Sequence, residues 1–486
     1  MQLPDSPVKK PKVLYSITGM PLYPEKDQSS GEHKLKRRTS TGSGGSTNSQ
    51  RPSHYSITGM PVPESELPPH KQYSITGMPL YPEPEEVRRH SKNALQRAML
   101  FEYAPSIARD QNAPYTSMLR QSRSGELVQI GDLHEKDGPG GFLAVGFEGY
   151  LYSVAKEGAA AFRIDRSTGA LEHLNTVKCD VAGGAHVAVA YSGSSGMVVS
   201  AAYHGGGINI LKILADGSLG APASILHKGE KEAHPHSCFI DPSGRYGLVS
   251  DLGLDRIYVY RLDVLGGALQ EEQILETTTD AGPRHMSFHP NGKFVYGINE
   301  LDSTINVYAF GKDGAILGPT LQTVSTLPDG YNNRDHVNAK NAKGDPASGP
   351  NRPPDQTNAT ADIHVSPDGR FLYGSNRGHD SLVCFSIGRD GLLTLVDFTS
   401  TEGAHPRNFS IHPSGSWVLV ANQDDSDNVV VFRRDKKTGN LQDAGTRATL
   451  KQARCIVWGP PVVKRKQPDW HSVGALQPEQ KAFRQT

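Results

Sequence analysis

The chain has 486 residues, and its 51 lysines and arginines balance its 51 aspartates and glutamates. A formal net charge of zero gives no reason to expect nucleic acid as a partner through bulk charge. No run of 18 apolar residues occurs, so the sequence predicts no membrane-spanning helix and no membrane partner. With 51 glycines, the composition favours a turn-rich β-protein.

Residues 1–92 differ in kind from the rest of the chain. They hold 13 of the 34 prolines, a Ser/Thr/Gly tract at residues 39–50 and a basic run at residues 34–38. Such a composition buries too little apolar surface to offset chain entropy, so we expect a disordered extension. The basic run is either a solvated charge cluster or a nuclear signal. The first residues lack the apolar core of a signal peptide, which favours a cytoplasmic location.

Within this extension one heptapeptide, Tyr-Ser-Ile-Thr-Gly-Met-Pro, occurs three times unchanged, starting at Tyr15, Tyr55 and Tyr73. Identity over seven residues between drifting spacers indicates a linear motif that a protein partner binds, with avidity from three copies. The alternative is a recent duplication inside a neutral segment.

Residues 93–124 are ambiguous. They have weak helical spacing followed by Pro105 and Pro114, and form either a connector or the degenerate first strands of the domain that follows. A gene-model fusion that replaced the original first strands of the domain is a further explanation for this weak pattern. From residue 125 a strand pattern begins.

A pattern of four short strands separated by turns recurs along the remaining chain. It is clearest in residues 282–317, where a Pro-Asn-Gly-Lys turn at Pro290 joins two apolar runs. Equivalent turn prolines are Pro242, Pro367 and Pro413, and relatives without the proline cover residues 185–219 and 150–171. A period of about 45 residues holding four strands is the signature of a β-propeller.

Residues 453–458 form a lone strand pattern, which indicates a last blade shared between the two chain ends. Six blades and this split blade predict an all-β, seven-bladed β-propeller over residues 125–461, followed by a disordered tail over 462–486. The inserted segment 328–360 is longer than a connection needs and is either a lid or disordered. The four cysteines have no metal-ligand spacing, and we expect reduced, mostly buried thiols and neither a metal nor a cofactor.

The register of the repeat predicts which polar residues meet. In each blade the start of the first strand and the end of the antiparallel second strand lie on one face of the disc. Six residues before the turn proline stand His236, Arg284 and Arg407, and ten residues after it stand Glu300 and Arg377. Each alone has a structural reading, as a hydrogen-bonding strand end. Together, arginines and a carboxylate on one rim favour a site for a small anionic molecule.

The segments GPRHMSFHPNGKFVYGINELDSTINVY, ADIHVSPDGRFLYGSNRGHDS and HPRNFSIHPSGSWVLVANQ resemble the seven-bladed propeller lactonases. That family includes bacterial-type 6-phosphogluconolactonases and fungal carboxy-cis,cis-muconate cyclases, and the resemblance covers residues 125–461. It implies an active site made of His236, Arg284, Glu300 and Arg377. We also assign substrate binding to the polar residues beside them, namely Arg407, His285, Asn376 and Asp251.

The resemblance implies hydrolysis of a sugar lactone, with a 6-phosphogluconolactonase-like activity in the pentose phosphate pathway as the first expectation. Glu300 or His236 takes a proton from water, one arginine holds the oxyanion, and Arg377 or Arg407 binds a remote phosphate. The alternatives are a muconate-type cyclase, in which the arginines bind substrate carboxylates, and a non-catalytic propeller that serves as a scaffold.

Overall fold

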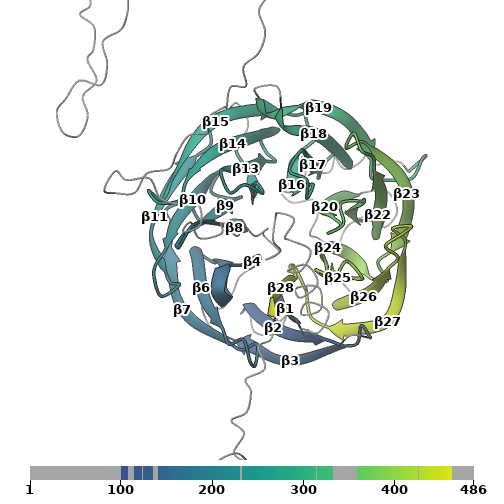
Figure 1. Ribbon diagram of the computed structural model, residues 1–486, viewed down its shortest axis with the longest axis horizontal. Coiled ribbons are helices and arrows are strands. Elements are labelled where there is room, and N and C mark those ends of the chain that lie inside the picture. The colour runs from purple at the N-terminus through teal and green to yellow at the C-terminus, as the bar shows by residue number, and fades with distance from the viewer. Residues whose placement is uncertain are drawn as a thin grey trace, which may run out of the picture. The chain divides into compact units, whose positions relative to one another are not determined.

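The computed structural model describes residues 100–107, 114–122, 124–134, 141–229, 232–312, 315–331, 358–424 and 426–461. These residues form seven four-stranded antiparallel sheets, which Figure 1 shows as blades arranged in a ring. The predicted all-β, seven-bladed β-propeller is confirmed. The predictions for residues 1–92, for the Tyr15, Tyr55 and Tyr73 repeats and for the tail 462–486 lie outside the described residues. Within the described part, no helix is long and apolar enough to cross a membrane.

In each blade the four strands lie side by side, in order from the centre of the ring to its outside. The innermost strands are β4 (Leu143–Val145), β8 (Gly184–Ser192), β12 (Pro235–Ile240), β16 (Pro283–Phe288), β20 (Ala359–Val365), β24 (Ala404–Ile411) and β28 (Val457–Pro461). The second strands are β5 (Tyr150–Ala155), β9 (Ser195–Ala202), β13 (Tyr246–Asp251), β17 (Phe294–Asn299), β21 (Phe371–Arg377), β25 (Trp417–Asp424) and β1 (Leu100–Ile107).

The third strands are β6 (Gly158–Ile164), β10 (Gly207–Ile213), β14 (Arg256–Asp263), β18 (Thr304–Lys312), β22 (Ser381–Ile387), β26 (Asn428–Arg434) and β2 (Pro114–Gln121). The outermost strands are β7 (Leu171–Lys178), β11 (Leu219–Leu226), β15 (Ala268–Glu276), β19 (Ala315–Ser325), β23 (Leu393–Ser400), β27 (Leu441–Thr449) and β3 (Leu127–His134). A short 3-10 helix, η2 (Phe147–Gly149), precedes β5.

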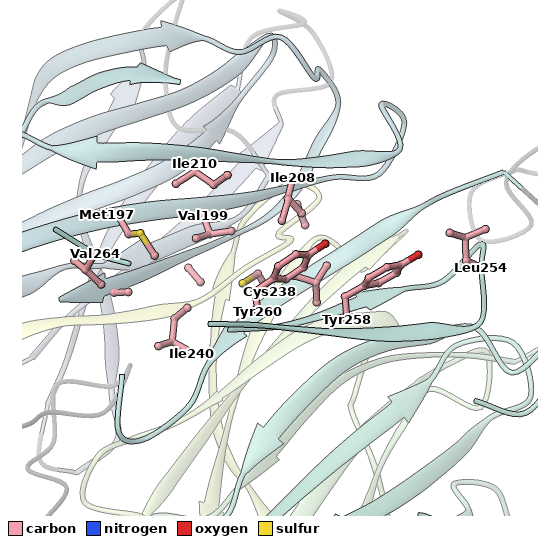
Figure 2. Close-up of a cluster of buried hydrophobic side chains, with 14 residues drawn as sticks. Met197, Val199, Ile208, Ile210, Cys238, Ile240, Leu254, Tyr258, Tyr260 and Val264 are labelled. Carbon is pink, nitrogen blue, oxygen red and sulfur yellow. The ribbon is translucent and has the colours of Figure 1, made fainter. Parts of the chain in front are cut away.

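The core lies between neighbouring blades. Both faces of the middle strands are covered, so these strands are nearly continuous apolar runs such as Ile-Tyr-Val-Tyr in β14. The outermost strands alternate exposed and partly buried residues, as in β7. Figure 2 shows one interface, in which Met197 and Ile210 of one blade pack against Ile240 and Tyr260 of the next. Stacking blades in this way buries apolar faces that one sheet alone would expose.

The ring closes through β28, which pairs with β1 in the register Tyr103↔Val457. One blade therefore takes its innermost strand from the end of the propeller sequence and its other three from the start. Strands β1 and β2 lie in the segment 93–124, before residue 125, which is the start that the sequence predicts for the propeller. Pro114 occupies the first position of β2, where a strand tolerates a residue without an amide proton.

Candidate active site

A β-bulge recurs at the same place in five of the innermost strands. In β12, β16 and β24 the pairing with the second strand skips His236, Arg284 and Arg407, respectively. The equivalent irregularity includes Ala185 in β8 and Ala361 in β20. A bulge adds one residue that has no partner on the neighbouring strand, and its side chain leaves the regular up-and-down alternation of the strand. Three predicted site residues thus occupy equivalent bulge positions in innermost strands, and these strands lie around the centre of the ring (Figure 1).

Two further site residues come from the ends of the second strands. Arg377 is the last residue of β21, and Glu300 follows β17 directly, with its amide donating to the carbonyl of Gly282 at 2.8 Å. Because first and second strands are antiparallel, these ends lie on the same side of the blade as the bulges. The local strand geometry therefore brings Glu300 beside Arg284.

Glu300 is held between two arginines. Its Oε2 lies 2.7 Å from Nε of Arg284, and its Oε1 lies 3.0 Å from Nη2 of Arg377. The exposed fraction is 8% for Glu300 and 2% for each arginine. The structure therefore brings three of the four predicted catalytic residues into one buried ion-pair cluster that spans two blades.

Backbone carbonyls of β20 fix both guanidinium groups. Arg284 donates from Nη1 to the carbonyl of Ala361, while Arg377 donates from Nε to Ala359 at 3.2 Å and from Nη2 to Thr360 at 2.9 Å. The start of β20 thus acts as a template that positions the two arginines against Glu300.

The charges of this cluster act on one another because they lie out of water. Burial raises the pKa of Glu300, but Arg377 and Arg284 outweigh burial and lower it from 4.5 to about 2. Burial and the neighbouring Arg377 lower the pKa of Arg284 to about 10. Glu300 is consequently a stable carboxylate at neutral pH, already engaged by two cations.

Arg407 differs from these arginines because it forms no ion pair or hydrogen bond within the described part of the chain. It is partly buried, and burial together with Arg284, Arg377 and Arg454 lowers its pKa to about 9. Among the described residues, three other arginines thus act on Arg407, and Glu300 is the carboxylate that offsets them there. This excess of positive charge favours binding of an anion.

Sequence reasoning missed Arg454, which precedes the closing strand. The segment is fixed beside the rim, because the amide of Ile456 donates to Oδ1 of Asn408 at 2.7 Å. Asn408 follows the bulged Arg407 in β24. The sequence signal was an arginine at the start of the lone strand pattern, but only ring closure shows that this strand reaches the centre.

His236 lies in the same region as a buried, neutral imidazole. It is 6% exposed, and its Nδ1 has no hydrogen-bond partner in the described structure. Burial, Arg284 and His285 hold its pKa well below the usual 6.5. Its ring centroid is 5.2 Å from that of His285 and 5.6 Å from that of Tyr203. A neutral imidazole near a cationic rim can accept a proton.

A second polar layer lies directly behind the bulged residues. The residue after each bulge is His186, Ser237, His285, Asp362 or Asn408, and all five are buried. Nδ1 of His285 is 2.8 Å from Asp362, whose other oxygen is 2.9 Å from Nε2 of His364 and accepts the Asn408 amide. The interiors of the innermost strands are therefore polar directly behind the rim. Polar residues here connect neighbouring blades through the centre of the ring.

Two residues predicted to bind substrate, Asp251 and Asn376, form hydrogen bonds with other residues of the propeller. The carboxylate of Asp251 contacts Nδ1 of His227 at 2.7 Å and accepts from the amides of His234 and Leu254. The amide of Asn376 bonds with Thr326, and Asn358 and Ser381 complete its environment. Both side chains are fully buried. These hydrogen bonds hold both side chains in place beside the second strands, and their contact with substrate stays a prediction.

The fold agrees with comparisons to known proteins. Residues 109–458 match the family described as "Lactonase, 7-bladed beta-propeller". This match spans well over half of the chain, and the chain belongs to that family.

The chain is similar to several bacterial proteins. The 6-phosphogluconolactonase of Bacillus subtilis is 33% identical over 318 residues, which cover 63% of this chain and 83% of that protein. An uncharacterized protein of Lactococcus lactis is 34% identical over 337 residues, which cover 67% of this chain and 89% of that protein. The solved structure of the periplasmic gluconolactonase of Pseudomonas aeruginosa has a TM-score of 0.64 at 25% identity, with 75% of this chain and 99% of that chain covered.

Proposed function

We propose that this protein hydrolyses an anionic sugar lactone, as a 6-phosphogluconolactonase does. The observation that carries the proposal is the rim on which Arg284, Arg377 and Arg407 surround one ionised carboxylate next to the neutral His236. The similarity to proteins named 6-phosphogluconolactonase supports the same class of substrate.

In this proposal His236 is the general base. Hydrolysis needs a group that takes a proton from the attacking water through a lone pair that no other residue already engages. Glu300 has a pKa of about 2 and both its oxygens are engaged by arginines. The imidazole of His236 has no such partner and stays neutral at pH 7. Of the two candidates that the sequence left open, the geometry supports His236.

Glu300 then serves to position the arginines. Its two oxygens fix the guanidinium groups of Arg284 and Arg377 on the rim. When water adds to the lactone carbonyl, the oxygen becomes negative, and a guanidinium that is already in place stabilises that charge without reorganisation. The proton on His236 passes to the ring oxygen as the ester bond breaks, which gives the hydroxy acid.

Arg407 is the better candidate for a remote phosphate. The donors of Arg377 are used by Glu300 and by two carbonyls of β20, whereas Arg407 forms no ion pair with the described residues. Arg454 adds a second positive charge close to Arg407. A dianionic phosphate near this pair offsets their mutual repulsion.

One assay tests the proposal. Purified protein is given 6-phosphogluconolactone, its unphosphorylated analogue and a carboxymuconate, with spontaneous hydrolysis subtracted. Faster turnover of the phosphorylated lactone supports the proposal. Turnover of the carboxymuconate alone would make the chain a cyclase that uses the same arginines for carboxylates. No turnover of any of them would leave a binding scaffold as the better account.

The cytoplasm remains our proposed compartment. Cys179, Cys238, Cys384 and Cys455 are all buried and free, which suits a reducing environment. Cell fractionation with a tagged chain tests this, and recovery in an oxidising compartment would contradict it.

We also propose a protein partner for the repeats at Tyr15, Tyr55 and Tyr73. It should bind a peptide of three copies much more tightly than a peptide of one.

A further inference from the structure

The second polar layer holds a histidine that the proposed reaction does not yet use. Nδ1 of His285 is 2.8 Å from Oδ1 of Asp362, and both side chains are 2% exposed. Burial raises the pKa of Asp362, but His364 and His285 outweigh it and hold that pKa below the ordinary range. An ionised carboxylate only accepts, so Nδ1 of His285 carries the proton and donates it. Its Nε2 is therefore a lone-pair acceptor.

This acceptor is buried and has no partner among the described residues. The same is true of Nδ1 of His236, on the adjacent ring. The two ring centroids are 5.2 Å apart at an interplanar angle of 64°. Buried polar nitrogens almost always have a hydrogen-bond partner, often an ordered water that joins two of them. Two such nitrogens on neighbouring rings can share one.

The other rings around this point do not satisfy either nitrogen. His186 lies 5.3 Å from His285, and its Nδ1 accepts from the amide of Cys238 at 3.4 Å. Phe142 and Phe239 lie 5.6 and 5.8 Å from His285 and offer only carbon atoms. Within the described part of the chain, neither nitrogen has a hydrogen-bond partner, and the two lie on neighbouring rings.

We propose that Asp362, His285 and one bound water fix the protonation of His236 for the lactone hydrolysis proposed above, on which this inference rests. His285 Nε2 accepts a hydrogen bond from the water, and the water oxygen accepts a hydrogen bond from Nδ1–H of His236. The proton of neutral His236 then sits on Nδ1, and the lone pair on Nε2 is free to accept a proton from the attacking water. His285 and Asp362 are positioning residues in this arrangement, which we name the Asp362–His285 relay.

Two substitutions at His285 separate the relay from a structural role. In His285→Asn the side-chain amide nitrogen takes the place of Nδ1 and still donates to Asp362. The shorter side chain has no acceptor at the position of Nε2, so the bridging water loses its contact with residue 285. In His285→Gln a polar atom reaches the place of Nε2, and the contact with Asp362 is weakened. The relay predicts that kcat falls by roughly 10²-fold in His285→Asn with little change in KM and in the unfolding midpoint. His285→Gln should retain more activity than His285→Asn.

A structural role predicts the opposite order, because only His285→Asn keeps the bond to Asp362. If His285→Asn retains wild-type kcat while His285→Gln loses it, the relay is overturned. The matched control is His186→Asn, which makes the same change one ring away and keeps an acceptor for the amide of Cys238. It should leave kcat within about threefold of the wild-type value if only the relay matters.

A spectroscopic measurement tests the relay independently of activity. Long-range 15N–1H spectra of the histidine-labelled full chain, assigned with His236→Gln, report which nitrogen of His236 carries the proton. The relay predicts the Nδ1–H tautomer in the wild type and its loss in His285→Asn. An Nε2–H tautomer, or no change in the variant, would overturn the relay. The predicted tautomer in a protein that opens no lactone would overturn the proposed function and leave the relay standing.

Discussion

Glu300 Oε2 lies 2.7 Å from Nε of Arg284, although the two residues come from different strands of their blade. Arg284 is the bulged residue of β16, and Glu300 follows the last residue of β17. The bulge removes Arg284 from the regular β16–β17 pairing at the point where β17 ends. The ion pair is thus a product of local strand geometry, and it can be tested apart from any substrate.

Replacement of Glu300 by glutamine should destabilise the fold. The change leaves Arg284 and Arg377 buried without a counter-charge, and breaking a buried ion pair costs about 3–5 kcal/mol. The folded-state pKa of Glu300 is depressed from 4.5 to about 2, so its stabilisation is complete above pH 4.5 and is lost as the pH falls toward 2. Urea unfolding at several pH values should therefore show the largest difference between wild type and variant near pH 7.

The control for this experiment is Glu276→Gln. Glu276 pairs with Arg256 at 3.2 Å on the surface, with a side chain that is 75% exposed. Exposed pairs contribute little, so this variant should stay within about 0.5 kcal/mol of the wild type. Equal effects of the two substitutions, or a difference that does not shrink at acidic pH, would show that Glu300 is not held as we describe.

Replacement of His236 by glutamine should abolish most of the turnover. If His236 is the general base, kcat for the lactone falls by roughly 10²–10⁴-fold while KM changes little. The pKa of His236 is well below 6.5, so the base form persists as the pH falls through 6.5 and is lost only at lower pH. The pH profile of kcat/KM should therefore be flat between about pH 6.5 and 8. A half-maximum near pH 6.5, or wild-type turnover by the variant, would point to another base.

Much of this architecture could be predicted from the sequence, because turns and strand periodicity are local. The turn prolines Pro242, Pro290 and Pro413 set the register, and that register placed Arg284 and Glu300 on one rim. The bulges were not visible, because a bulge depends on the pairing between strands. Counting residues from the turn nevertheless identified the bulged positions, since the strands between have equal lengths.

The second polar layer and the partners of Asp251 could not be predicted for a related reason. Asp362 lies in one of the repeated strand patterns, but its partners His285 and Asn408 come from two other blades. Asp251 contacts His227, which lies in a loop and comes 24 residues earlier in the sequence. Polar contacts of this kind are settled by the packing of blades, which strand periodicity does not describe.

Removal of the closing strand should weaken the whole ring. A chain that stops after Ile456 loses β28, its pairing with β1 and the buried Trp458, which packs against the last blade. Loss of a buried tryptophan alone costs about 3–5 kcal/mol, and the lost strand pairing adds to this. A chain that stops after Pro461 keeps β28 and is the matched control. The measurement is the urea midpoint, and equal midpoints for the two chains would contradict closure through β28.

The last prediction concerns the anion that Arg407 binds. Burial and three neighbouring arginines lower the pKa of Arg407 to about 9, so Arg407 stays charged at neutral pH and a bound anion relieves the repulsion among these arginines. Inorganic phosphate should therefore stabilise the wild type against heat, by about 2.7 kcal/mol at a concentration 100 times the dissociation constant. Arg407→Ala should lose this effect and raise KM more for a phosphorylated lactone than for its unphosphorylated analogue.

Arg377→Ala should behave differently, because Arg377 is engaged by Glu300 and by the carbonyls of Ala359 and Thr360. Its loss removes a support of the Glu300 cluster, so both lactones should be affected alike and the unfolding midpoint should fall. The comparison of the two variants is decisive. If Arg377→Ala shows the selective penalty for phosphate and Arg407→Ala shows none, the phosphate lies on the Glu300 side of the rim, and the excess charge around Arg407 serves another anion.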